Sequence, residues 1–152
     1  MKTRTHQQYA ALILGLTLCG ASIADQQSGA LASAPGSKAN WIISCEPEGS
    51  VASSRLAFQI EGLTKGRKFT VKATAQKDGV IASTVDLKSA DKKPSAYGYD
   101  IAGDGAYLVS IQKVVLVGPQ TTAKLKGNML YSLTAHCESS NGVHTRTLIR
   151  RG

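Results

Sequence analysis

Lys68-Phe-Thr-Val-Lys-Ala-Thr-Ala-Gln76 alternates apolar and polar side chains along its whole length. In an extended chain, Phe69, Val71, Ala73 and Ala75 fall on one side and the polar side chains fall on the other. A period of two is typical of a β-strand with one buried face. The stretch therefore predicts a strand that turns its apolar side toward a core.

The same alternation recurs along most of the chain after residue 39. The expected inner faces carry Trp41, Ile43 and Cys45; Leu56, Phe58 and Ile60; Ile81, Val85 and Leu87; Tyr107, Val109 and Ile111; and Tyr131, Leu133, Ala135 and Cys137. Turn signals, such as Asp78-Gly79 and the Ser139–Gly142 stretch, separate these segments. About eight strands and no helix over residues 40–152 favour an all-β antiparallel β-sandwich of jelly-roll or Ig-like type, or a barrel.

The first residues have the pattern of a cleaved export signal. Lys2 and Arg4 precede a short apolar run, and Ser22-Ile-Ala24 offers small side chains to a signal peptidase. The run is too short for a spanning helix, which needs about 20 apolar residues. We therefore expect a signal peptide over residues 1–24, a periplasmic or secreted location and no integral membrane span. Lipidation of Cys19 is the alternative.

Residues 25–39 are small and polar and show no period. This composition is typical of a flexible segment, so we expect a flexible leader between the signal and the folded domain.

The expected mature chain is basic and has two cysteines. It keeps 16 of the 18 Lys and Arg residues and all 10 Asp and Glu residues, which gives a net charge of +6. The cations are spread along the chain, as on a solvated surface, although they would also suit an anionic polymer or an acidic protein. Aromatic residues do not interleave with them, so we expect no nucleic-acid partner. In an exported domain, Cys45 and Cys137 are expected to form a disulfide; two buried free thiols are the alternative.

Gly103-Asp-Gly-Ala-Tyr-Leu-Val-Ser-Ile111, followed by Leu130-Tyr-Ser-Leu-Thr134, resembles the last part of bacterial pre-peptidase carboxyl-terminal domains. Those exported β-sandwiches often end with a Gly-x-Tyr-x-Val-like strand and then a Tyr-x-Leu-x strand. The resemblance covers about a quarter of the chain. It implies a β-sandwich that acts as an accessory, ligand- or surface-associating module. It assigns no binding residue to a position here, and the cysteine pair and the hairpin after Cys137 depart from the pattern.

The best candidate for a binding loop is the connection Lys92-Lys-Pro-Ser-Ala-Tyr-Gly-Tyr99. Lys92 and Lys93 supply positive charge, and Tyr97 and Tyr99 supply aromatic surface. Loops on a rigid β-scaffold commonly carry recognition, although a packed tyrosine beneath solvated lysines is the simpler interpretation.

Other candidate chemistry is weaker. We expect His136 and His144 to lie on different faces of the last hairpin, so no metal site and no cofactor is predicted from them. Asp100 and Asp104 are too few oxygens for calcium and are expected to stabilise turns. The serines lie in no Gly-x-Ser-x-Gly elbow, and a disulfide would leave no thiol nucleophile.

The sequence therefore favours an exported non-enzymatic binding or accessory module of the bacterial envelope. Its partner would be an envelope protein or an anionic polysaccharide, recognised through surface loops; the oligomeric state is open. Two alternatives remain: a periplasmic inhibitor or immunity protein that blocks a secreted enzyme with the 88–97 loop, and a hydrolase with an unrecognised site.

Overall fold

A computed structural model describes residues 25–34, 36–65, 69–116 and 127–152. The expected signal peptide, including Cys19, lies outside these residues. The described chain consists of strands and their connections, and none of it forms a helix that is long and apolar enough to cross a membrane. The strands are β1 (Asp25–Leu31), β2 (Lys38–Glu46), β3 (Arg55–Gly62), β4 (Phe69–Lys77), β5 (Val80–Val85), β6 (Gly98–Asp100), β7 (Gly105–Val115), β8 (Met129–Glu138) and β9 (His144–Arg151).

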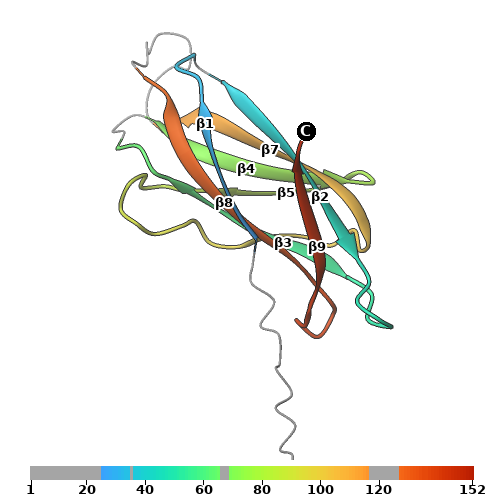
Figure 1. Cartoon of the computed structure of the whole chain (residues 1–152). Helices are drawn as coiled ribbons and strands as arrows, with labels where there is room; N and C mark the ends of the chain where they lie inside the picture. The colour runs from blue at the N-terminus through green and yellow to red at the C-terminus, as the bar shows by residue number, and fades with distance from the viewer. Residues whose placement is uncertain (1–24, 35, 66–68, 117–126) are drawn as a thin grey trace, which may run out of the picture.

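All strand pairs are antiparallel and follow the order β5-β4-β7-β2-β9-β8-β3-β6, while β1 adds to β8 (Figure 1). β9 joins the two halves, because it pairs with β8 at its start and with β2 along the rest of its length. The two ends of the order also meet: the Thr84 hydroxyl of β5 donates to the carbonyl oxygen of Ala96, just before β6, at 2.7 Å. The predicted all-β antiparallel fold is confirmed, and its sheet forms a nearly closed barrel.

The core follows the alternation in the sequence for β2, β3, β7 and β8. All of the apolar residues expected inside on these strands are at least nine-tenths buried. The Trp41 indole N–H donates to the Tyr131 hydroxyl at 3.0 Å, which satisfies a polar group in the middle of the core.

Cys45 and Cys137 form the predicted disulfide. Their Cα atoms lie 5.5 Å apart, although 92 positions separate them in the chain. The bond joins β2 to β8, the two strands that flank β9. It therefore closes the barrel where β9 passes from one half to the other.

The expected flexible leader is wrong for its first half. Asp25–Leu31 is strand β1 and pairs with β8 from Ala135 to Met129. Leu31 is fully buried in the core, and Gly29 lies against the ring of Tyr131. A segment of small polar residues forms a strand here because it covers an edge of β8 that would otherwise expose unpaired backbone groups.

The inner face predicted for β5 is also wrong. Ile81 is 64% exposed and Leu87 is 71% exposed, whereas Thr84 is buried. The two-residue turn at Asp78-Gly79 sets the register by pairing Lys77 with Val80, so Ile81 lies opposite the outward-facing Gln76.

One position of β4 departs from the alternation. Thr70 was expected outside but is fully buried, because the segment after β5 covers the start of β4. The Thr70 hydroxyl donates to the carbonyl oxygen of Asp86 and lies 3.0 Å from the Ser89 hydroxyl.

Candidate functional site

A row of charged and titratable side chains crosses the outer face of the sheet where β8 ends and β9 begins. Arg55 of β3 lies opposite Glu138 of β8, and Glu138 lies opposite His144, the first residue of β9. Cys137, the neighbour of Glu138, points into the core, so Glu138 points to the other face. The three strands therefore bring a cation, a carboxylate and an imidazole to one place.

A second row lies beside the first. Tyr99 of β6 pairs with Ala57 of β3, which pairs with His136 of β8. His136 lies two residues before Glu138 and therefore on the same face. Tyr97, just before β6, adds its ring to this row. We call the two rows together the outer cluster; its members are Arg55, Tyr97, Tyr99, His136, Glu138 and His144.

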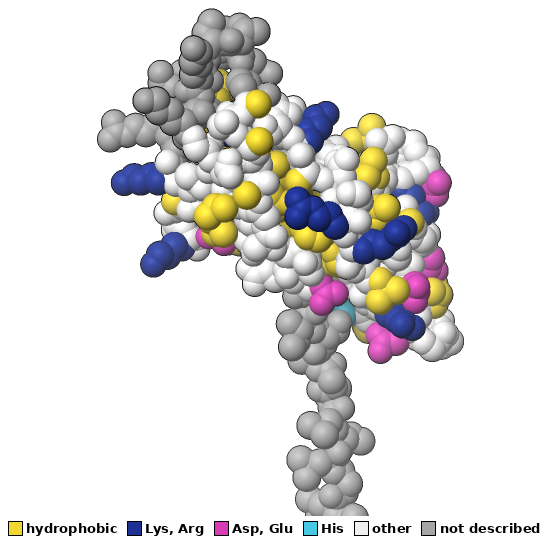
Figure 2. Space-filling model, turned by 45° about the horizontal axis from the view of Figure 1, so that its top comes forward, with side chains coloured by type: hydrophobic (Ala, Val, Ile, Leu, Met, Phe, Trp, Pro, Cys, Tyr) yellow, Lys and Arg dark blue, Asp and Glu magenta, His cyan; other side chains and the backbone are white. Residues whose placement is uncertain are grey.

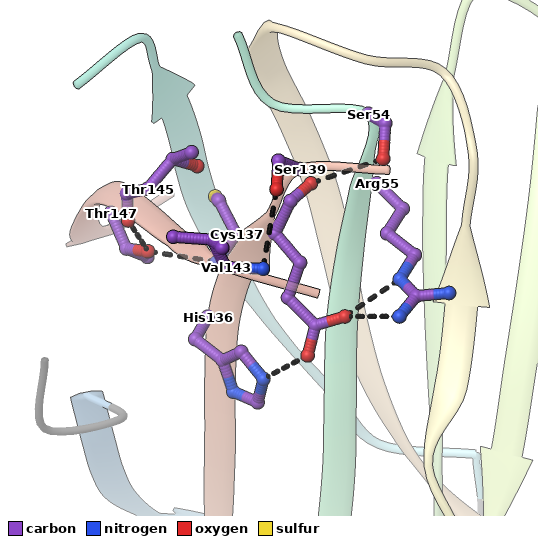
Figure 3. A network of polar contacts seen from close by, with 9 residues as sticks. Ser54, Arg55, His136, Cys137, Ser139, Val143, Thr145 and Thr147 are labelled. Carbon is purple, nitrogen blue, oxygen red and sulfur yellow. Dashed lines mark hydrogen bonds and ion pairs between the residues drawn. The ribbon is translucent and has the colours of Figure 1, made fainter. Parts of the chain in front are cut away.

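Glu138 is the centre of the polar contacts (Figure 3). The Arg55 Nε and Nη2 atoms both lie 2.6 Å from its Oε2 atom, and His136 Nε2 lies 2.6 Å from its Oε1 atom. Glu138 and His136 are only 8% and 6% exposed. Burial alone would raise the pKa of Glu138, but the hydrogen bonds from His136 and Arg55 and the charge of Arg55 outweigh it and lower the pKa. Glu138 is thus held ionised.

Aromatic contacts cover this polar centre. The Tyr97 and Tyr99 rings are stacked with centroids 6.1 Å apart, and the Tyr97 ring meets the His136 ring edge to face at 5.6 Å. The Arg55 guanidinium lies 4.7 Å from the centroid of Tyr99. Tyr97 and Tyr99 remain 40% and 46% exposed. The outer cluster therefore exposes two tyrosines to solvent and holds the buried carboxylate of Glu138 beneath them.

The prediction that the two histidines lie on different faces is wrong. The centroids of the His136 and His144 rings are 4.2 Å apart. The pairing of Glu138 with His144 places His144 on the face of Glu138, and strand alternation places His136 on that same face.

The fold places the lysines and the tyrosines of the predicted binding loop in different surroundings. Tyr97 and Tyr99 join the outer cluster, whereas Lys93 lines an open pocket of about 220 Å³ together with Asp86, Asp91 and Pro94. Lys92 is exposed and has a positive φ of 62°, in the turn before Lys93. The two lysines and the two tyrosines therefore belong to different surfaces.

Asp100 and Asp104 bind backbone N–H groups. The Ala102 N–H donates to Asp100 Oδ1 at 3.2 Å, and the Ser53 N–H donates to Asp104 Oδ1 at 2.8 Å. Asp100 is fully buried, and its Oδ2 atom has no hydrogen-bond partner among the described residues. Burial raises the pKa of Asp100, and the Ala102 N–H and the charge of Lys77 offset this only in part.

Asp100→Asn is expected to raise the free energy of unfolding at pH 7, because it removes a carboxyl whose pKa burial raises. Because the pKa is raised in the folded state, the charged carboxyl costs nothing below its unfolded pKa and opposes folding once the pH exceeds the folded pKa. The gain should therefore vanish below about pH 4. Urea unfolding of both proteins from pH 3 to pH 8 measures it, with the exposed Asp91→Asn as control. A gain that does not change with pH contradicts this explanation.

Two members of the outer cluster, Arg55 and Glu138, were missed in the sequence. Arg55 is one of 18 dispersed cations, and its strand has no unusual pattern. The sequence does contain a signal for Glu138. His136-x-Glu138 ends one strand, and His144 follows after a five-residue connection. This pattern can place three metal-ligand side chains on one face of a hairpin. No family model, curated protein or solved structure matches this chain.

Proposed function

We propose that this protein is an exported, non-enzymatic binding module of the bacterial envelope that recognises an anionic glycan through the outer cluster. The observation that carries the proposal is the exposed Tyr97–Tyr99 stack with the Arg55 guanidinium against its outer ring. Stacked aromatic side chains present apolar area to the flat face of a sugar ring, and a guanidinium beside them suits a carboxylate or sulfate group.

The surroundings of the stack support an anionic ligand. The Arg55 side chain is 35% exposed, so N–H groups beyond the Glu138 contact face solvent. The expected mature chain carries a net charge of +6, which attracts anionic polymers over a distance. Lys and Arg side chains are scattered over the face in Figure 2 rather than gathered in one patch. Scattered charge favours encounter, and the aromatic stack then supplies selectivity.

The contacts within the outer cluster also support a role in binding rather than catalysis. Glu138 is engaged by Arg55 and His136 and held ionised, so it is poorly suited to act as a general acid. Cys45 and Cys137 are oxidised and offer no thiol nucleophile. Their disulfide is consistent with an oxidising compartment, which supports export.

An inhibitor that inserts the 88–97 loop into an enzyme is a weaker proposal. The Ala90 N–H donates to the carbonyl oxygen of Gly62, and the Ser95 N–H donates to that of Ile60. These bonds fasten the loop along β3, whereas an inhibitory loop projects from its scaffold.

The proposal also includes a fold type within the all-β class, the two-layer β-sandwich. We infer that β1, β8, β3 and β6 correspond to one layer of a sandwich and that β5, β4, β7 and β2 correspond to the other, with β9 linking them. This arrangement supports the resemblance to pre-peptidase carboxyl-terminal domains, which are accessory modules.

The double variant Tyr97→Ala/Tyr99→Ala is expected to bind a uronic-acid oligosaccharide at least tenfold more weakly, about 1.4 kcal/mol, because central aromatic side chains dominate such surfaces. Calorimetric titration measures the affinity. Tyr97→Phe/Tyr99→Phe keeps the rings and should stay within a few-fold of the wild type. Leu108→Ala, which truncates an exposed side chain on β7, is the matched control. Equal losses in the tyrosine and Leu108 variants, or no binding by the wild type, would refute the proposal; binding of an acidic protein instead would favour the protein-partner alternative.

A further inference from the structure

Beneath the tyrosines, His136, Glu138 and His144 each offer a metal-ligand atom. These three atoms all lie within 4.8 Å of one another. Donor atoms around a tetrahedral zinc ion, with bonds of about 2.1 Å, lie about 3.4 Å apart. The three ligand atoms would therefore need to move only slightly closer together to bind zinc. His144 can make this movement, because it is only partly buried and directly follows the 139–143 connection.

A purely structural ion pair explains only part of this arrangement. It accounts for the contacts of Glu138 with Arg55 and with His136 Nε2. It does not account for His136 Nδ1, which is buried and has no hydrogen-bond partner among the described residues. The ring is 94% buried, so an unsatisfied nitrogen is costly there. The His144 ring lies beside it, with the two ring centroids 4.2 Å apart and the ring planes inclined by 35°.

We propose that His136, Glu138 and His144 bind a divalent transition-metal ion of the zinc type. Two imidazoles and one carboxylate are borderline donors that suit zinc, copper or nickel, whereas magnesium and calcium prefer oxygen ligands. This inference goes beyond the proposed glycan function and does not depend on it.

Arg55 acts as the positioning residue of this site. Its Nε and Nη2 atoms both hold Glu138 Oε2, which leaves Oε1 to meet His136 Nε2 (Figure 3). Ligating carboxylates are commonly held in this way by a second set of hydrogen bonds. Three protein ligands also leave one tetrahedral position for solvent or for a group of a bound molecule.

Calorimetric titration of the metal-stripped, oxidised full chain with zinc chloride tests the site without any glycan. We expect one zinc ion per chain and an affinity at least tenfold lower in His144→Ala. Glu48→Ala removes an exposed carboxylate outside the outer cluster and is the control, with unchanged affinity expected. Magnesium chloride should not bind. The Tyr97→Ala/Tyr99→Ala variant should retain zinc binding, which separates this inference from the glycan proposal.

A second measurement covers the case in which His144→Ala does not fold. In the wild type, one equivalent of zinc should shift the ring NMR signals of both His136 and His144. No zinc uptake by the wild type, full affinity in a folded His144→Ala variant, or ring signals that stay unshifted at one equivalent would each overturn the assignment.

Discussion

Replacing both cysteines of the disulfide, as Cys45→Ala/Cys137→Ala, is expected to lower the free energy of unfolding by about 4 kcal/mol. The bond closes a loop with a sequence separation of 92, and the entropy that it removes from the unfolded chain grows with loop length. It also joins β2 and β8 across β9, where the Thr147 hydroxyl accepts the Cys137 N–H at 2.9 Å. The loss should therefore include some of the contacts of β9.

Guanidinium unfolding of the oxidised wild type and the double variant measures this difference. Ser140→Ala changes an exposed side chain in the 139–143 connection and is the control, which should unfold as the wild type does. A difference below about 1 kcal/mol between the wild type and the double variant would show that the bond is not what holds the barrel closed.

Gly29→Val is expected to lower the free energy of unfolding by about 3 kcal/mol, because over-packing a filled site displaces its neighbours. A Cβ atom at position 29 would overlap the Tyr131 hydroxyl oxygen and would lie 2.6 Å from the Tyr131 Cζ atom. The Tyr131 side chain is fully buried and its hydroxyl oxygen accepts the indole N–H of Trp41, so the ring cannot move without breaking that bond. Gly29→Val would therefore either separate β1 from β8 or disrupt the packing of the core around Tyr131.

Thermal and urea unfolding of Gly29→Val measures the loss. Ser28→Ala changes the exposed neighbour on the same strand and should have little effect. If Gly29→Val proves as stable as Ser28→Ala, β1 does not pack on β8 as described.

Alternation predicted most of the barrel because each of its main strands has one face in the core. The prediction from alternation failed for β5, where a turn sets the register, and for β1, where pairing with another strand sets the structure. Ile81 is apolar, but the Asp78-Gly79 turn sets a register that places it outside. β1 contains few apolar side chains, and its pairing depends on the free edge of β8, which cannot be seen within the segment itself.

The candidate site was predicted only in part. Tyr97 and Tyr99 stood out as aromatic residues on a polar connection, and they do lie in the outer cluster. Their association with His136 arises from the pairing of β3 with both β6 and β8, and that pairing is long-range. Arg55 joins them through the same pairing, and nothing local in the sequence marks it.

The most direct test of the account is an NMR titration of the wild-type protein with a uronic-acid oligosaccharide, which shows where the ligand binds. We expect saturable shifts in the ring signals of Tyr97 and Tyr99 and in the side-chain Nε–H signal of Arg55, with little change on β7. Shifts spread over the lysines, with the tyrosine rings unaffected, would contradict it.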